Sequence, residues 1–116
     1  MITKIAVMLD YGCYPVWLYD ENGFVEDTLL PEELRGDLEL DAKFDDLQSR
    51  YDALFVDNRH EFSYVGFKSD HEKELFVHDW THAVKELKNK LGERYEFVDM
   101  TSDVLALDVA PAKNQD

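Results

Sequence analysis

The stretch from Ser69 to Gly92 carries the clearest helical pattern of the chain and constrains the fold around it. Ser69 and Glu72 have the S-x-x-E spacing of a capping box, in which two side chains satisfy free N–H groups at a helix start. Gly92 is suited to the C-terminal end. Between them, apolar residues recur at helical spacing, at Phe76, Trp80, Ala83, Val84, Leu87 and Leu91. They form one stripe about 100° wide, so this helix buries a single face against a sheet.

Strand-forming stretches lie on both sides of this helix. Residues 4–10 are a continuous apolar run, which is typical of a strand buried on both faces and central in its sheet. Residues 16–19 and 24–27 are two further runs, joined by Asn22-Gly23, a strong hairpin signal. The beginning of the chain therefore predicts an antiparallel meander of three strands.

The segment after the meander predicts a second helix. Residues 31–34 resemble a single helical turn with proline at its first position. Asp41 is expected to cap the second helix, which ends near Val56. Residues 54–56 can alternatively form a strand.

Three later stretches are expected to be strands, at residues 61–67, 95–98 and 104–109. Gly66 within the first of them indicates a bulge or a close approach of another backbone. The order of elements predicts an α+β fold. Its sheet is mostly antiparallel, built from the N-terminal three-strand meander and the later strands, with two α-helices packed on one face.

The length and composition predict one domain over residues 1–109 and a frayed tail over residues 110–116. A hydrophobic content of 45% with 13% aromatic residues suits a packed core. The single cysteine, Cys13, has no disulfide partner within the chain, and no apolar run approaches about 18 residues. We therefore expect a cytoplasmic protein that does not bind membranes.

Negative charge is the unusual property of this chain, and it is concentrated in the first half. Residues 10–57 contain fourteen acids and three bases, a balance of −11 in a total of −14. A field of this sign steers a basic protein partner and disfavours nucleic acid. The alternative is that the acidity only keeps the protein in solution.

The candidate partner-binding residues combine these acids with two tyrosines. Tyr11 and Tyr14 lie in a turn beside acidic neighbours, which is the composition of an interface hot spot, although both can also belong to the core. The expected set is Asp10, Tyr11, Tyr14, Asp20, Glu21, Glu26, Asp27, Glu32, Glu33, Asp37, Asp45 and Asp46. We expect a monomer or a weak dimer.

Three histidines share one stripe of the long helix, opposite its apolar face. His78 and His82 have the i, i+4 spacing of a helical zinc site, with Asp79 where H-E-x-x-H has glutamate, and His71 lies upstream. These side chains are expected to face water, so we interpret them as a polar helix face. A metal-binding protein or metal-dependent hydrolase using this stripe is the alternative. We otherwise predict no enzyme, no cofactor and no metal site.

Four runs of residues resemble a family of small acidic bacterial proteins. They are D-Y-G-C-Y-P-V-W-L-Y-D-E-N-G at 10–23, L-P-E-E-L at 30–34, Y-D-A-L-F-V-D at 51–57 and E-F-S-Y-V-G-F at 61–67. They are similar to the immunity proteins of polymorphic-toxin and contact-dependent inhibition systems. The resemblance implies a non-catalytic protein that binds a cognate toxin domain, often a basic nuclease, and covers its active site or substrate groove. A non-catalytic acidic adaptor or regulatory domain is the alternative.

Overall fold

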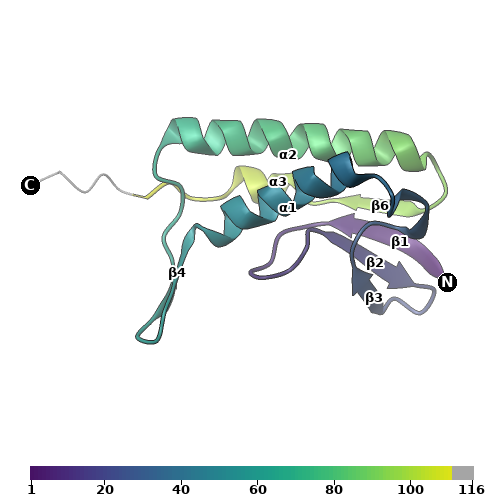
Figure 1. Ribbon diagram of the computed structural model, residues 1–116, viewed down its shortest axis with the longest axis horizontal. Helices are drawn as coiled ribbons and strands as arrows, with labels where there is room; N and C mark the ends of the chain where they lie inside the picture. Colours follow the sequence, from purple (N-terminus) through teal and green to yellow (C-terminus); the bar gives the residue numbers. More distant parts are fainter. Residues whose placement is uncertain (111–116) are drawn as a thin grey trace, which may run out of the picture.

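A mixed four-stranded sheet forms the base of the structure, a computed structural model that describes residues 1–110 (Figure 1). β1 (Ile2–Val7), β2 (Val16–Asp20) and β3 (Val25–Thr28) form the predicted antiparallel meander. β6 (Glu96–Asp99) pairs parallel with β1, so the strand order is β3-β2-β1-β6 and β1 is internal, as predicted. The prediction of an α+β fold with a mostly antiparallel sheet is confirmed.

Two long helices, α1 (Leu38–Asp52) and α2 (Asp70–Leu91), pack on one face of the sheet and leave the other face open (Figure 1). The predicted start of α2 is confirmed, because the Ser69 hydroxyl accepts a hydrogen bond of 3.1 Å from the N–H of Glu72. Its predicted end is confirmed as well, since Gly92 follows the last turn with a φ of 63°.

The core lies between the sheet and the predicted stripe of α2. All six apolar positions of that stripe are buried, namely Phe76, Trp80, Ala83, Val84, Leu87 and Leu91. The opposing side chains of β1 and β2 that are fully buried are Ile5, Val7, Val16 and Leu18. Burying one large aliphatic side chain contributes about 1.5–3 kcal/mol, so this layer supplies much of the driving force for folding.

The start of α1 corrects the prediction. The N-cap is Asp37 rather than Asp41, and its carboxylate accepts a hydrogen bond of 3.0 Å from the N–H of Leu40. Leu40 is fully buried, so the apolar face of α1 begins one turn earlier than the sequence pattern indicated. Asp41 instead lies in the first turn, where a negative charge interacts favourably with the helix dipole.

The segment between the helices forms a separate hairpin. β4 (Phe55–Asp57) pairs with β5 (Phe62–Tyr64) in a two-stranded antiparallel sheet that projects away from the main one (Figure 1). The prediction that this helix ends near Val56 is wrong, because α1 ends at Asp52, and the strand alternative is correct for Phe55 and Val56, whereas Leu54 lies in the turn before β4. The predicted turn at residues 31–34 is present as a short 3-10 helix, η1 (Glu32–Leu34).

The predicted strand at residues 104–109 is wrong. Its first part belongs to a short helix, α3 (Thr101–Leu105), and only Val109 makes an isolated bridge, to Phe67. The alternation of apolar residues does not produce a buried strand face, because Val104 is buried whereas Leu105 is 55% exposed. The predicted frayed tail lies outside the described residues from residue 111 onward.

Gly66 makes the close backbone approach that the sequence indicated. Its φ is 92°, and a Cβ atom placed on it would lie 2.7 Å from the carbonyl oxygen of Asp108. The neighbouring Phe67 donates its N–H to that same oxygen at 2.9 Å and accepts from the N–H of Ala110 at 2.7 Å. A side chain at position 66 would therefore push the segment after α3 away from the body.

We expect Gly66→Ala to lower the free energy of unfolding by about 1–3 kcal/mol, from backbone strain alone. The matched control is Gly36→Ala, because Gly36 has no positive φ and open space around its Cβ position. Urea unfolding followed by circular dichroism measures both variants. Equal midpoints for the two would contradict the close approach at Gly66.

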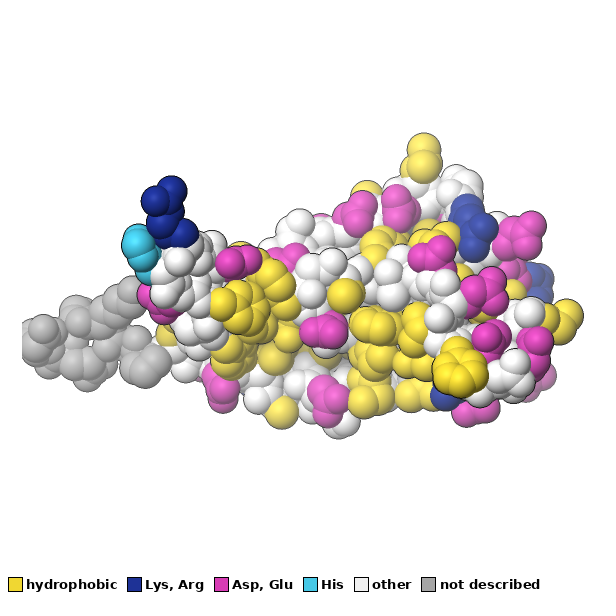
Figure 2. All heavy atoms as spheres, turned by 90° about the horizontal axis from the view of Figure 1, so that it is seen from below, with side chains coloured by type: hydrophobic (Ala, Val, Ile, Leu, Met, Phe, Trp, Pro, Cys, Tyr) yellow, Lys and Arg dark blue, Asp and Glu magenta, His cyan; other side chains and the backbone are white. Residues whose placement is uncertain are grey.

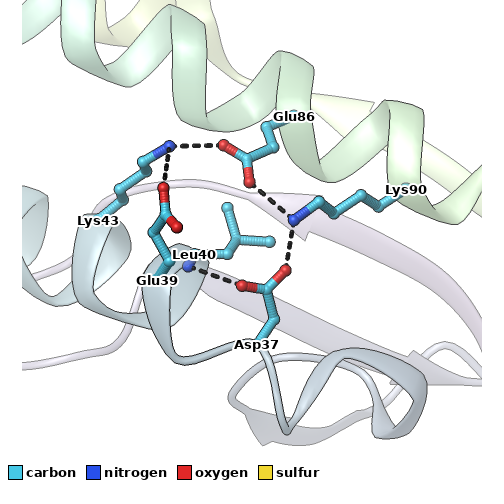
Figure 3. A network of polar contacts seen from close by, with 6 residues as sticks. All are labelled: Asp37, Glu39, Leu40, Lys43, Glu86 and Lys90. Atoms are coloured by element: carbon cyan, nitrogen blue, oxygen red, sulfur yellow. Dashed lines mark hydrogen bonds and ion pairs between the residues drawn. The ribbon is translucent and has the colours of Figure 1, made fainter.

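A series of ion pairs joins the beginning of α1 to the end of α2 (Figure 3). Lys90 contacts Asp37 and also Glu86 at 2.9 Å, and Glu86 in turn contacts Lys43 at 2.7 Å. Lys43 also lies 3.9 Å from Glu39. Hydrogen bonding from Lys90 holds the pKa of Asp37 below its usual value, with a smaller effect from the N–H of Leu40. The ionised form of Asp37 therefore stabilises the folded chain.

We predict that Asp37→Asn lowers the urea midpoint at pH 7, because asparagine can still cap α1 but cannot pair with Lys90. A carboxyl whose pKa falls on folding stabilises the folded state at every pH above its pKa in the unfolded chain, which is here 3.8. This contribution is lost as the pH falls through the lower pKa of the folded state. The midpoints of the variant and the parent should therefore converge below about pH 3.8. Asp45→Asn is the control, because burial and then Asp41 raise the pKa of Asp45, so its neutralisation should not destabilise the fold at pH 7. A pH-independent difference for Asp37→Asn would contradict this account.

Candidate functional site

Several of the predicted partner-binding acids are engaged within the chain. Glu33 accepts hydrogen bonds from Arg94 at 3.0 Å and from the hydroxyl of Tyr95, and Asp37 pairs with Lys90 as described above. Asp46 forms an i, i+4 ion pair with Arg50 of the same helix, at 3.0 Å. Glu33 and Asp37 fix one element against another, whereas the Asp46 pair lies within α1, and part of the predicted acidic surface is already neutralised.

Tyr14 is also used inside the molecule. Its ring is half-buried, with its centroid 6.2 Å from that of Phe44, and its hydroxyl donates to Asp41 at 2.8 Å. Burial first, and then this hydrogen bond, raises the pKa of Tyr14 far above its usual value. The residue thus attaches the loop after β1 to α1.

A second group of predicted acids surrounds the β2–β3 end of the sheet. Asp20 is half-buried, and its carboxylate accepts the N–H groups of Asn22 and Phe24, which shapes the hairpin turn. The exposed members of the group are Glu21, Glu26, Asp27 and Glu32. No lysine or arginine side chain within residues 1–110 pairs with any of these five. Asp45 is likewise exposed, on α1.

The turn at Asp10 and Tyr11 lies against the β4–β5 hairpin. The Tyr11 hydroxyl donates to Asp57 at 2.9 Å, and its ring packs edge-on against Phe55 and Phe62, with centroids 5.0 and 4.9 Å away. The N–H of Tyr11 donates to the Asp10 carboxylate at 2.9 Å. The contact between turn and hairpin brings the predicted residues Asp10 and Tyr11 together with Phe55, Asp57 and Phe62.

A third carboxylate belongs to the same place. Asp52, at the end of α1, accepts the N–H of Gly12 at 3.0 Å and the side-chain amide of Gln48 at 2.7 Å. Asp10, Asp52 and Asp57 therefore surround the turn that carries Tyr11. Sequence reasoning did not select Asp52 or Asp57 as site residues, because their contacts with the turn span 40 and 46 residues of chain.

Aromatic rings form an exposed surface beside these carboxylates. We call the group of Tyr11, Phe55, Phe62 and Tyr64 the aromatic pad. Phe62 is 56% exposed and Tyr64 is 39% exposed, and Phe55 joins them with centroid separations of 5.4 and 5.2 Å. Figure 2 shows hydrophobic side chains gathered over the hairpin, with acidic side chains next to them.

A second hydrophobic area covers the open face of the sheet (Figure 2). Trp17 and Tyr19 lie half-buried there, and Lys4 stacks its ammonium 4.5 Å from the centroid of the Tyr19 ring. Phe24, in the turn between β2 and β3, is 70% exposed. The described chain thus presents two areas on which another protein could pack.

The histidine stripe lies on the outer side of α2. His71, His78 and His82 are all exposed, and the last two have ring centroids 4.3 Å apart. Within residues 1–110, no group of three His, Cys, Asp or Glu side chains has an arrangement that could hold a metal ion. No helix in this part of the chain is both long enough and apolar enough to cross a membrane.

Comparison with known proteins shows a match to a protein family. No curated protein matches the chain. The model of a family described as "Serratia CdiI immunity protein-like" matches residues 3–102, which include all of the sheet except the first residue of β1, both long helices and the β4–β5 hairpin. This is the class of protein that the runs at residues 10–23, 30–34, 51–57 and 61–67 resemble. The chain therefore belongs to the Serratia CdiI immunity protein-like family.

Proposed function

We propose that this protein is a cytoplasmic immunity protein that binds one cognate toxin domain and neutralises it without catalysis. Membership of an immunity protein family supports the role in general. The balance of −11 within residues 10–57 is the observation that carries the finer proposal of a basic, nuclease-type toxin. An acidic protein surface attracts such a domain and competes with its anionic substrate. Neither nucleic acid nor a membrane is a partner in this proposal.

The mechanism is occlusion, with the acidic surface guiding the encounter. Charges outside the contact area act through the long-range field and mainly increase the association rate, whereas close contacts in the interface determine how slowly the complex dissociates. Exposed acids such as Glu26 and Glu32, which have no lysine or arginine partner within residues 1–110, are suited to the first task. Acids that are already paired, such as Glu33 and Asp37, contribute less to the external field. The protein acts as a monomer or a weak dimer in this account.

The direct test is coexpression with the cognate toxin domain. We expect the protein to restore growth to cells that produce this domain, and to elute with it as a one-to-one complex in size-exclusion chromatography. The complex should form more slowly as salt is added, because ions screen the charges that steer it. Loss of viability with no complex would contradict the immunity role.

The contribution of the acidic surface is tested by charge reversal. We predict that the double variant Glu26→Lys and Glu32→Lys associates about tenfold more slowly with the toxin domain and depends less on salt. Its matched control is Glu74→Lys with Glu93→Lys, which makes the same change of charge at exposed positions of the second half. Stopped-flow or surface-based kinetics at two salt concentrations distinguish them. Equal slowing by both pairs would show that only net charge matters.

A further inference from the structure

The aromatic pad has features that the core of the molecule does not require. Three of its four rings lie on a hairpin outside the main sheet (Figure 1), the fourth belongs to the Tyr11 turn, and two of the four remain exposed. Single exposed hydrophobic side chains are ordinary, but a cluster of exposed aromatic rings on a projecting element is typical of a protein-binding surface. The hairpin presents Phe62 and Tyr64 on the same face, since they are two residues apart in one strand.

The carboxylates around the pad differ from those between the helices. Each of Asp10, Asp52 and Asp57 uses a single oxygen for its hydrogen bonds inside the chain, through Oδ1, Oδ1 and Oδ2 respectively, and that of Asp52 accepts two. The other oxygen of each has no hydrogen bond to the part of the chain that the structure describes. None of the three forms an ion pair there, whereas Asp37 and Glu33 do. The pad is thus bordered by oriented carboxylates with which no lysine or arginine of residues 1–110 forms an ion pair.

We propose that the aromatic pad is the anchor for a basic segment of the cognate toxin domain. The inference rests on the proposed function and adds the place and chemistry of the contact. The aliphatic stem of a toxin arginine or lysine covers the exposed faces of Phe62 and Tyr64. Its charged head reaches a free carboxylate oxygen of Asp57 or its neighbours.

The surface is organised before the partner arrives. Tyr11 holds the turn against the hairpin through its ring contacts and its hydrogen bond to Asp57, and Asp52 fixes the next residue, Gly12. The same hydrogen bond raises the pKa of Tyr11, as expected for a hydroxyl that donates to a carboxylate. A surface whose side chains are already placed loses less conformational entropy on binding.

The negative charge around the aromatic pad distinguishes between the partners that could bind there. A second copy of this chain would bring the same carboxylates toward each other, which costs free energy because like charges repel. An anionic membrane surface would be repelled for the same reason. A basic protein segment is complementary to both the rings and the acids.

The test compares two exposed phenylalanines at opposite ends of the molecule. We predict that Phe62→Ala raises the Kd for the toxin domain at least tenfold, which corresponds to ~1.4 kcal/mol or more, mainly through faster dissociation, because aromatic anchors at the centre of an interface carry much of the binding energy. Phe24→Ala should change the Kd less than about threefold, although Phe24 is the more exposed of the two at 70%. Calorimetry and binding kinetics with the purified toxin domain give both numbers, and urea midpoints check that each variant is folded.

A charge variant distinguishes the effect of a carboxylate at the aromatic pad from the effect of the overall negative charge. Asp57→Asn can still accept the Tyr11 hydroxyl, so it removes one charge at the pad and should weaken binding more than the equivalent Asp45→Asn on α1. A larger effect of Phe24→Ala than of Phe62→Ala would assign the interface to the open face of the sheet and overturn this proposal, while leaving the immunity role intact. Absence of binding by the unmodified protein would overturn both.

Discussion

Burial of one face of α2 against β1 and β2 is the interaction on which the rest of the structure depends. The stripe from Phe76 to Leu91 is continuous and closed to solvent, and it faces the fully buried side chains of the two central strands. Because α2 covers the sheet from one side, the opposite face of the sheet stays open. α1 packs beside α2, and the chain that connects them leaves the body as the β4–β5 hairpin. The position of the candidate binding surface therefore follows from how the core is built.

The acidic character of the chain has two structural roles. Between the helices and at η1, carboxylates such as Asp37, Glu86 and Glu33 are matched by lysine and arginine, so they hold elements together. In the described residues, the carboxylates around Tyr11 and at the β2–β3 end of the sheet form no ion pair with a lysine or arginine side chain. A surplus of one sign destabilises a compact protein by self-repulsion, and the basic partner that we propose would relieve this repulsion.

The elements that could be predicted from the sequence are those that depend on patterns of neighbouring residues. The bounds and buried face of α2 and the N-terminal meander were correct because helical and alternating periods are local properties. The strand expected at residues 104–109 was wrong, because an alternating pattern does not reveal which side chains reach a core. The contact of Tyr11 with Asp57 joins positions 46 residues apart and has no local signal. Two members of the candidate surface, Asp10 and Tyr11, were therefore predicted as binding residues, whereas the hairpin residues that complete it were predicted only as strands.

Hydrogen–deuterium exchange of this protein, alone and bound to the toxin domain, tests the central claim most directly. The account predicts that slowed exchange on binding is concentrated in the turn around Tyr11 and in the hairpin from Phe55 to Tyr64, with little change at the turn between β2 and β3. Protection confined to β2, β3 and their connecting turn, with the hairpin unchanged, would contradict it. The exchange pattern reports the contacted segments without altering a side chain, so it is independent of effects on stability.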